Sequence, residues 1–196
     1  MNQTISYYNE HAEEFCAATG NADMSFCRRK FLCFLRQGGH ILDAGCGSGR
    51  DARAFLGAGY EVTAMDASFN ICKEAEKLLH RNVICMSFEE MNFRREFDGI
   101  WACASLLHIP KNAMIQVLER CRMALKENGV LYASFKYGQG ERITKGRLFN
   151  NYQEDSLEEL MVKARFSVIE IFISKDVRAD RDAEQWVNVL AGKGAD

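Results

Sequence analysis

The chain has 196 residues, with 25 Lys and Arg against 27 Asp and Glu. Its 47% hydrophobic and 27% charged content is typical of a soluble globular protein and excludes a mainly disordered chain. A net charge of −2 argues against nucleic-acid binding by bulk charge but leaves a local basic patch open. No apolar run reaches 18 residues, so we expect no membrane-spanning segment and no membrane partner.

The cysteines and the first residues bear on the compartment. No C-x-x-C pair occurs, so zinc-ribbon and thioredoxin-like sites have no support and we predict no metal site. Most of the eight cysteines lie in apolar runs, which favours free, partly buried thiols over a disulfide framework. The start of the sequence also lacks the basic and apolar regions of a secretory signal. We therefore expect a cytoplasmic protein.

Taken in chain order, residues 1–38 are polar and aromatic, with a spacing that indicates short helices. From residue 39 onward strands and helices alternate, and we see no linker or repeat. The predicted strands cover 40–44, 60–65, 82–85, 97–104, 129–135, 166–174 and 185–191. The predicted helices cover 50–58, 69–79, 111–125 and 155–164, and a turn is expected at 127–129.

This alternation predicts an α/β fold. Successive strand–helix–strand units form right-handed crossovers, which build a mostly parallel sheet with helices on both faces. The last two strands have no helix between them, so they can pair only as an antiparallel hairpin at the end of the sheet. We expect seven strands in a single domain over 1–196, in which 1–38 form a helical lid on a core of 39–196.

The most informative segment is Asp43-Ala44-Gly45-Cys46-Gly47-Ser48-Gly49-Arg50, between the first strand and the helix after it. An open α/β sheet binds its ligand at this position, and glycines let the backbone approach a ligand closely. Asp66 ends the next strand, where a carboxylate can bind ribose hydroxyls. The segment therefore predicts a site for a nucleoside-containing cofactor.

Two details of the loop favour S-adenosylmethionine over NAD. A dinucleotide fingerprint reads G-x-G-x-x-G, but Arg50 stands at its sixth position. Asp43 would place a negative charge near the diphosphate of a dinucleotide. The same carboxylate attracts a ligand that carries an ammonium and a sulfonium, and a partly dry pocket strengthens that attraction.

Residues 43–50 with Asp66 resemble motif I and the following acid of class I S-adenosylmethionine-dependent methyltransferases. The likeness extends over about 40–193, through a fourth-strand motif at 97–102 and the segment 106–109. Small bacterial enzymes, including those of the tellurite-resistance type, look most similar. The resemblance implies a Rossmann-like seven-stranded fold that binds S-adenosylmethionine.

The resemblance also implies roles for particular residues. By this resemblance, Asp43 lies at the amino-acid end of the cofactor and Asp66 binds the ribose. Residues 87–88 flank the adenine, although Ser87 replaces the acid that the family often has there. The full set of expected cofactor residues is Tyr7, Asp43, Gly45, Cys46, Gly47, Arg50, Asp66, Ala67, Ser87, Phe88, Ala102 and Cys103. Cys46 and Cys103 are expected to fill the pocket wall, since no activating base stands near them in the sequence.

We place His108 and Tyr8 at the catalytic centre. His108 either packs its loop and positions other groups or acts as a general base, and the sequence favours positioning because a base must first reach the substrate proton. Tyr7 and Tyr8 either hold the N-terminal helix in place or close over the sulfonium by a cation–π contact. Both possibilities stay open.

The expected substrate loop covers 136–152, with Lys136, Tyr137, Arg142 and, from further along the chain, Arg178 as candidate substrate residues. The sequence is equally consistent with a solvated flexible loop and with a lid that recognises an anionic or polar substrate.

The predicted reaction is methyl transfer by direct displacement to a small-molecule acceptor. An RNA or protein acceptor, and a non-catalytic module that only binds S-adenosylmethionine, remain alternatives, and an NAD oxidoreductase is a more distant one. The fourth strand is not followed by the Asn-Pro-Pro-Tyr tetrad of amino-methylating nucleic-acid enzymes, and Pro110, the one proline, is not followed by Cys as in cytosine C5 enzymes. Those two routes of base methylation are therefore disfavoured. The oligomeric state is not predicted.

Overall fold

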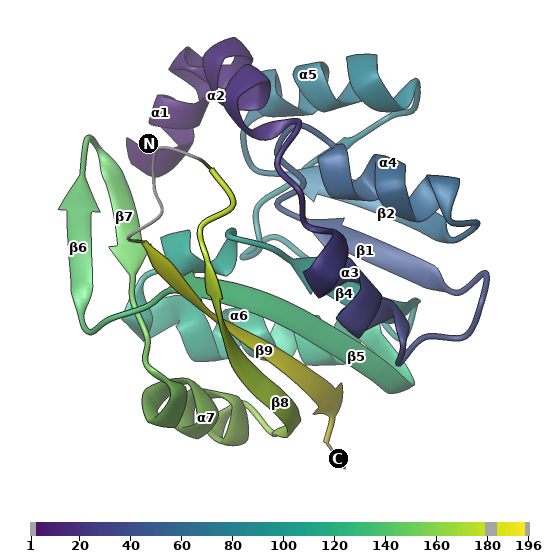
Figure 1. Cartoon of the computed structure of the whole chain (residues 1–196), viewed down its shortest axis with the longest axis vertical. Helices are drawn as coiled ribbons and strands as arrows, with labels where there is room; N and C mark the ends of the chain where they lie inside the picture. Colours follow the sequence, from purple (N-terminus) through teal and green to yellow (C-terminus); the bar gives the residue numbers. More distant parts are fainter. Residues whose placement is uncertain (1–2, 179–183, 195–196) are drawn as a thin grey trace.

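The computed structural model describes residues 3–178 and 184–194, which form a central sheet covered by helices (Figure 1). The strands are β1 (His40–Ala44), β2 (Glu61–Asp66), β3 (Ile84–Cys85), β4 (Phe97–Ala102), β5 (Leu125–Lys136), β6 (Glu141–Thr144), β7 (Arg147–Asn150), β8 (Phe166–Lys175) and β9 (Gln185–Lys193). The helices are α1 (Gln3–Glu10), α2 (Ala12–Thr19), α3 (Ser25–Leu32), α4 (Arg50–Gly57), α5 (Phe69–Leu79), α6 (Lys111–Ala124) and α7 (Glu154–Lys163), with a 3-10 turn η1 (Leu106–His108).

The main sheet confirms the predicted α/β class and the seven strands. Its order is β3-β2-β1-β4-β5-β9-β8. The first five strands in this order are parallel, β9 is antiparallel to β5, and β8 is antiparallel to β9. The chain moves outward from β1 in one direction and from β4 in the other. The loops after these two strands therefore diverge, and this divergence opens a crevice at their carboxyl ends.

Helices cover both faces of the sheet (Figure 1). On one face, Phe31 of α3 and Phe55 of α4 pack with Trp101 and Tyr132, two aromatic side chains from the middle of the sheet. On the other face, α6 and α7 contribute Leu118, Leu157 and other apolar residues to the largest core cluster. Burial on both faces explains why the central strands read as almost continuous apolar runs. None of the helices in the described ranges is long and apolar enough to cross a bilayer.

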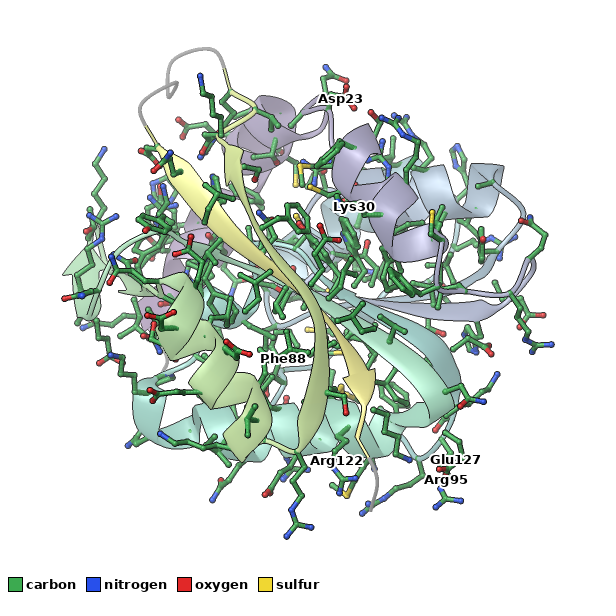
Figure 2. The ribbon with its side chains drawn as sticks, turned by 60° about the horizontal axis from the view of Figure 1, so that its bottom comes forward. Asp23, Lys30, Phe88, Arg95, Arg122 and Glu127 are labelled. Atoms are coloured by element: carbon green, nitrogen blue, oxygen red, sulfur yellow. The ribbon has the colours of Figure 1, made fainter. Side chains whose placement is uncertain are left out.

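Several strand boundaries differ from the prediction by one to four residues, and those of β4 and β5 have a visible backbone cause. β4 ends at Ala102 rather than at residue 104, because Ala104 adopts a φ of 52° that takes the chain out of the ladder. β5 begins at Leu125, so the turn predicted at 127–129 is wrong. Phe97 pairs with Leu125 and Gly99 with Val130, so the extra β5 residues bulge out of the ladder instead of ending it. Arg95 and Glu127 form an exposed ion pair of 3.2 Å beside this bulge (Figure 2).

The segment predicted as a flexible loop at 136–152 contains a second sheet, in which β6 and β7 form an antiparallel hairpin. Its turn consists of Lys145 and Gly146, whose φ angles are 50° and 74°. Left-handed conformation at both central residues is the geometry of a type I′ turn, whose twist matches that of paired strands. The sequence did not predict this hairpin because lysine stands where asparagine or aspartate is usual.

A buried ionic cluster joins α3, α4 and β4. Asp51 accepts hydrogen bonds from Arg28 and Arg50, each at 2.6 Å, and from the indole N–H of Trp101 at 3.0 Å. Its side chain is 6% exposed. Burial raises the pKa of the Asp51 carboxyl, but Arg50 and then Arg28 lower it further, so the pKa lies below its usual value. The carboxylate therefore stays ionised and holds the three elements together.

We expect Asp51→Ala to lower the free energy of unfolding by about 3–5 kcal/mol, because it leaves two guanidinium groups in a buried position without their counter-charge. Urea unfolding at pH 7 measures this change. The matched control is Glu74→Ala, which removes a carboxylate from the exposed Lys77 pair of α5 and should move the unfolding midpoint very little. Equal effects of the two variants would contradict a structural role for Asp51.

Candidate active site

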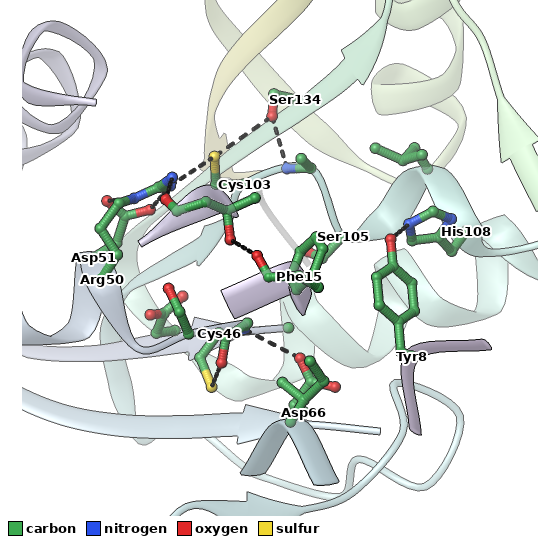
Figure 3. Close-up of a pocket in the computed structure, with 18 of the residues that line it drawn as sticks. Tyr8, Phe15, Cys46, Arg50, Asp51, Asp66, Cys103, Ser105, His108 and Ser134 are labelled. Carbon is green, nitrogen blue, oxygen red and sulfur yellow. Dashed lines mark hydrogen bonds and ion pairs between the residues drawn. The ribbon is translucent and has the colours of Figure 1, made fainter. Parts of the chain in front are cut away.

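The crevice at the carboxyl ends of β1, β2 and β4 leads into a cavity of about 320 Å³ (Figure 3). Its floor is the loop after β1, its far wall comes from the loop after β4 and the ends of β5, β8 and β9, and α1 with β7 covers it. Parts of the chain that are distant in sequence therefore meet around one space.

The glycine loop begins at the end of β1 and is held by backbone hydrogen bonds. The N–H groups of Gly45 and Cys46 both donate to the carbonyl of Met65, at 2.8 and 2.9 Å. Gly45 has a φ of 76°, and a Cβ at this position would collide with the Cβ of Ser105 in the loop after β4. Only glycine fits where these two loops touch. The Ser105 hydroxyl closes the contact by donating to the carbonyl of Ala44 at 2.7 Å.

Two carboxylates lie in this floor, of which Asp43 is buried and Asp66 half-buried. Asp43 is 2% exposed and accepts the N–H of Ala52 at 3.0 Å. Asp66 accepts the N–H of Gly47 at 3.1 Å and that of Ser68 at 2.9 Å (Figure 3). Burial raises the pKa of both carboxyls, and the nearby charge of Asp51 adds to the effect at Asp43. The surrounding protein therefore compensates the negative charge of either ionised carboxyl only in part.

Arg50 and Cys103 form part of the wall. Besides its ion pair with Asp51, Arg50 donates to the carbonyl of Thr19 at 3.2 Å and lies 3.9 Å from the Cys103 sulfur. The Ser134 hydroxyl lies at the same distance from that sulfur (Figure 3). Burial raises the pKa of the Cys103 thiol to about 12, and burial also raises that of Cys46. Both cysteines are thiols at neutral pH, so they do not act as nucleophiles. All eight cysteines are free, as predicted.

Beyond Asp66 the cavity continues along Ala67, Ser87 and Phe88, the residues expected around an adenine. Phe88 is 7% exposed and supplies an apolar surface. The backbone N–H and the hydroxyl of Ser87 both donate to Glu90, at 2.9 Å each.

Helix α1 closes over the cavity and is attached on two sides. Toward α5, Asn9 accepts hydrogen bonds from Ser68 at 2.8 Å and from the N–H of Asn70 at 3.1 Å. Toward the hairpin, the Thr4 hydroxyl accepts the N–H of Leu148 at 3.0 Å. The cavity is lined on this side by three residues of α1, Thr4, Ile5 and Tyr8. Helix α1 therefore lies over the cavity, and the assignment of residues 1–38 as a lid stays a prediction.

Tyr8 and His108, the two predicted catalytic residues, contact each other (Figure 3). The Tyr8 oxygen lies 2.9 Å from Nε2 of His108, and Nδ1 of the same ring lies 2.6 Å from the carbonyl of Leu148. A carbonyl only accepts, so Nδ1 carries the proton and Nε2 accepts from the Tyr8 hydroxyl. Burial is the main reason that the pKa of His108 falls to about 4, and burial raises the pKa of Tyr8. Both groups are neutral at pH 7.

The predicted substrate residues separate into two pairs. Lys136 and Arg178 line the cavity, where Lys136 pairs with Glu184 and Arg178 with Asp176. Tyr137 and Arg142 lie outside the residues that line it. Arg142 is exposed on β6, with its guanidinium 5.6 Å from the ring of Phe149.

Most of the predicted cofactor residues line the cavity: Asp43, Gly45, Cys46, Gly47, Arg50, Asp66, Ala67, Ser87, Phe88 and Cys103. Ala102 is fully buried beneath it and Tyr7 lies to one side, stacked on His11 at 4.3 Å between ring centroids. Sequence reasoning did not select Phe15, Ser105, Arg147, Phe149 and Trp186, which also line the cavity. No local pattern marks these five residues, since their place depends on contacts between distant segments.

Comparisons with known proteins agree with this geometry. Residues 41–129 match a family model described as a methyltransferase domain. A curated protein from Geobacillus sp. strain WCH70, named as a methyltransferase, is 30% identical over 119 residues, which make up 57% of this chain and 48% of that protein. The chain thus spans about half the length of that relative.

Two solved structures show how widely the fold is shared. A Burkholderia thailandensis 1,6-didemethyltoxoflavin-N1-methyltransferase, solved with 1,6-didemethyltoxoflavin and S-adenosylhomocysteine, superposes with a TM-score of 0.86 at 23% identity, covering 98% of this chain and 88% of that one. The [4+2]-cyclase SpnF superposes with a TM-score of 0.80 at 15% identity, covering 100% and 97%. The narrower likeness to tellurite-resistance enzymes stays a prediction. Residues 41–129 therefore match a methyltransferase domain, and the chain has the fold of class I S-adenosylmethionine-dependent methyltransferases.

Proposed function

We propose that the protein is an S-adenosylmethionine-dependent methyltransferase that acts on a small molecule. The observation that carries this proposal is the pair of partly compensated carboxylates, Asp43 and Asp66, which lie at the ends of β1 and β2 beside the glycine loop of the cavity floor. Asp43 suits the ammonium of the cofactor and Asp66 the ribose hydroxyls, while Ala67 and Phe88 provide an apolar place for the adenine.

The proposed reaction is a direct displacement. A nucleophilic atom of the acceptor forms a bond to the methyl carbon, the bond from carbon to sulfur breaks, and its electron pair stays on sulfur as S-adenosylhomocysteine leaves. The methyl donor is already activated, so alignment and exclusion of water can supply most of the catalysis. We assign alignment to Tyr8, held by His108, because a histidine with a pKa of about 4 is a weak base at neutral pH.

The cover over the cavity supports a small acceptor. Helix α1 and strand β7 lie across it and are joined by the Thr4–Leu148 hydrogen bond. A large RNA or protein surface would have to displace both elements. The solved neighbour from Burkholderia is named for methylation of a small heterocycle, which agrees with this choice. Lys136 and Arg178 are proposed substrate contacts at the β9 end, and the eight free thiols support a cytoplasmic location.

A labelling experiment separates the classes of acceptor. A cell extract is incubated with the protein and methyl-labelled S-adenosylmethionine, then divided into small molecules, protein and RNA. Label that depends on the added protein should appear in the small-molecule fraction. Label in RNA or protein would replace the small-molecule proposal with the macromolecular one, and a module that only binds the cofactor would label no fraction.

Binding of the cofactor product tests the site itself. S-adenosylhomocysteine should raise the melting temperature of the protein, since a ligand that binds only the folded state stabilises it by mass action, and NAD should not. Asp66→Ala should abolish most of the S-adenosylhomocysteine shift. Glu61→Ala, an exposed acid at the other end of the same strand, is the matched control and should leave the shift intact. An unchanged shift in Asp66→Ala would contradict the proposed site.

The pKa of Asp43 predicts a dependence on pH. A carboxyl whose pKa is raised on folding favours the folded state below the unfolded pKa of about 3.9, and this stabilisation is lost as the pH rises through the folded pKa. In the absence of cofactor, Asp43→Asn should therefore gain stability relative to the wild type as the pH rises from 4.5 to 8. Urea unfolding across this range measures the difference in free energy of unfolding between the variant and the wild type. A difference that stays constant with pH would show that Asp43 does not carry a raised pKa.

The environment of His108 gives a spectroscopic prediction. With a pKa of about 4 and its proton on Nδ1, the ring should remain neutral between pH 5.5 and 8. Long-range ¹H–¹⁵N NMR spectra of the ring should show a protonated Nδ1 and an unprotonated Nε2 throughout this range. Exposed His80 serves as the internal control in the same spectra. Titration of His108 near pH 6.5 would restore the general-base reading.

A further inference from the structure

We propose that Arg147 binds an anionic group on the methyl acceptor, so that the acceptor enters the site as an anion. The inference rests on the proposed function and names the chemical class of its substrate. The group that fits is a carboxylate, or an equally delocalised oxyanion, on a planar ring.

Arg147 is the first residue of β7 and lines the cavity. Its guanidinium carbon lies 4.4 Å from the ring centroid of Tyr7, 5.2 Å from that of Phe149 and 5.9 Å from that of Tyr8. The Nε atom is buried and has no hydrogen-bond partner in the part of the chain that the structure describes. Three aromatic rings thus hold a guanidinium whose donors are not all used by the protein.

The charges of the cavity distinguish Arg147 from its neighbours. Arg50, Lys136 and Arg178 each form an ion pair with a carboxylate. Over 3–178 and 184–194, the structure gives Arg147 no such ion pair, and its contacts are with aromatic rings and the Tyr8 side chain. The positive charge of Arg147 is therefore available to a ligand.

The position of Arg147 is fixed through the next residue. The N–H of Leu148 donates to Thr4 of α1, and the carbonyl of Leu148 accepts from His108 of η1. The guanidinium also acts on Tyr8 through a hydrogen bond and through its charge, which oppose the larger effect of burial on the Tyr8 pKa. Arg147 is thus held beside the Tyr8–His108 pair, where we place the transferred methyl group.

Two positive charges would then share one enclosed space, the guanidinium and the sulfonium of the cofactor. Like charges in a poorly solvated cavity repel, and an anion between them removes the repulsion and is attracted by both. A planar carboxylate matches the forked guanidinium through two parallel hydrogen bonds. The rings of Tyr7 and Phe149 beside it favour an acceptor with a flat, apolar body.

The test uses matched pairs of probes on protein saturated with S-adenosylhomocysteine. Benzoate is compared with benzamide, and 2-naphthoate with 2-naphthamide, and the dissociation constants are measured by calorimetry. The wild type should bind at least one carboxylate about tenfold or more tightly than its amide. Arg147→Gln should bring that ratio close to one, and Arg147→Met, which keeps the packing on the rings, should do the same.

Lys145→Gln is the matched control, since it removes the same charge from the exposed turn of the same hairpin and should keep the wild-type ratio. Affinity for S-adenosylhomocysteine, measured first, reports whether each variant is folded. If both Arg147 variants lose affinity for S-adenosylhomocysteine, the proposal is judged on the ratio of carboxylate to amide affinity in the wild type alone. Failure of the wild type to bind S-adenosylhomocysteine would overturn the proposed function. Two results would overturn the role of Arg147 alone. In the first, the wild type binds S-adenosylhomocysteine but does not prefer carboxylates to amides. In the second, that preference survives in Arg147→Gln or Arg147→Met.

Discussion

The hydrogen bond from the Ser105 hydroxyl to the carbonyl of Ala44 joins the loops that follow β1 and β4. These loops leave the sheet in opposite directions, and the cavity exists because they diverge. They nevertheless touch at one point, where Gly45 leaves no room for a side chain. The contact fixes the glycine loop relative to the loop that leads to His108. The contact therefore links the floor of the cavity to the end that holds the Tyr8–His108 pair.

The site contains three carboxylates, on β1, α4 and β2, whose pKa values are shifted in opposite directions. Asp51 has two guanidinium partners and a pKa below its usual value, so its charge is used in holding α3, α4 and β4 together. Asp43 is buried and Asp66 half-buried, but hydrogen bonds from backbone N–H groups do not offset their desolvation, and their pKa values are raised. One acid stabilises the fold, whereas the other two destabilise it when ionised. This is the distribution expected where a cationic ligand completes the charge balance.

The parts of the molecule that the sequence predicted are those governed by local pattern. The alternation of strands and helices determines the sheet, and the glycine loop with Asp66 depends on residues close to β1 and β2. The cover was predicted less well because it depends on contacts between distant segments, such as that between Tyr8 and His108, 100 residues apart. Lys136, the last residue of β5, lines the cavity, but Tyr137, the next residue, does not. Predicting this difference from the sequence would require the end of β5 to be located to within one residue, because successive side chains of a strand point to opposite faces. The hairpin carries Arg147 into the cavity and leaves Arg142 outside, and only the register of β6 and β7 decides which.

Leu148 is held through both of its backbone polar groups, one bonded to α1 and the other to η1. Movement of β7 away from the cavity breaks both bonds, and movement of α1 breaks the first together with the Tyr8–His108 contact. Separation of β7 or α1 from the cavity therefore requires two of these contacts to break together. In the proposed methyltransferase, a cover joined in this way would make acceptor entry and product departure depend on the same contacts, and the rate of breaking them would set an upper limit on turnover.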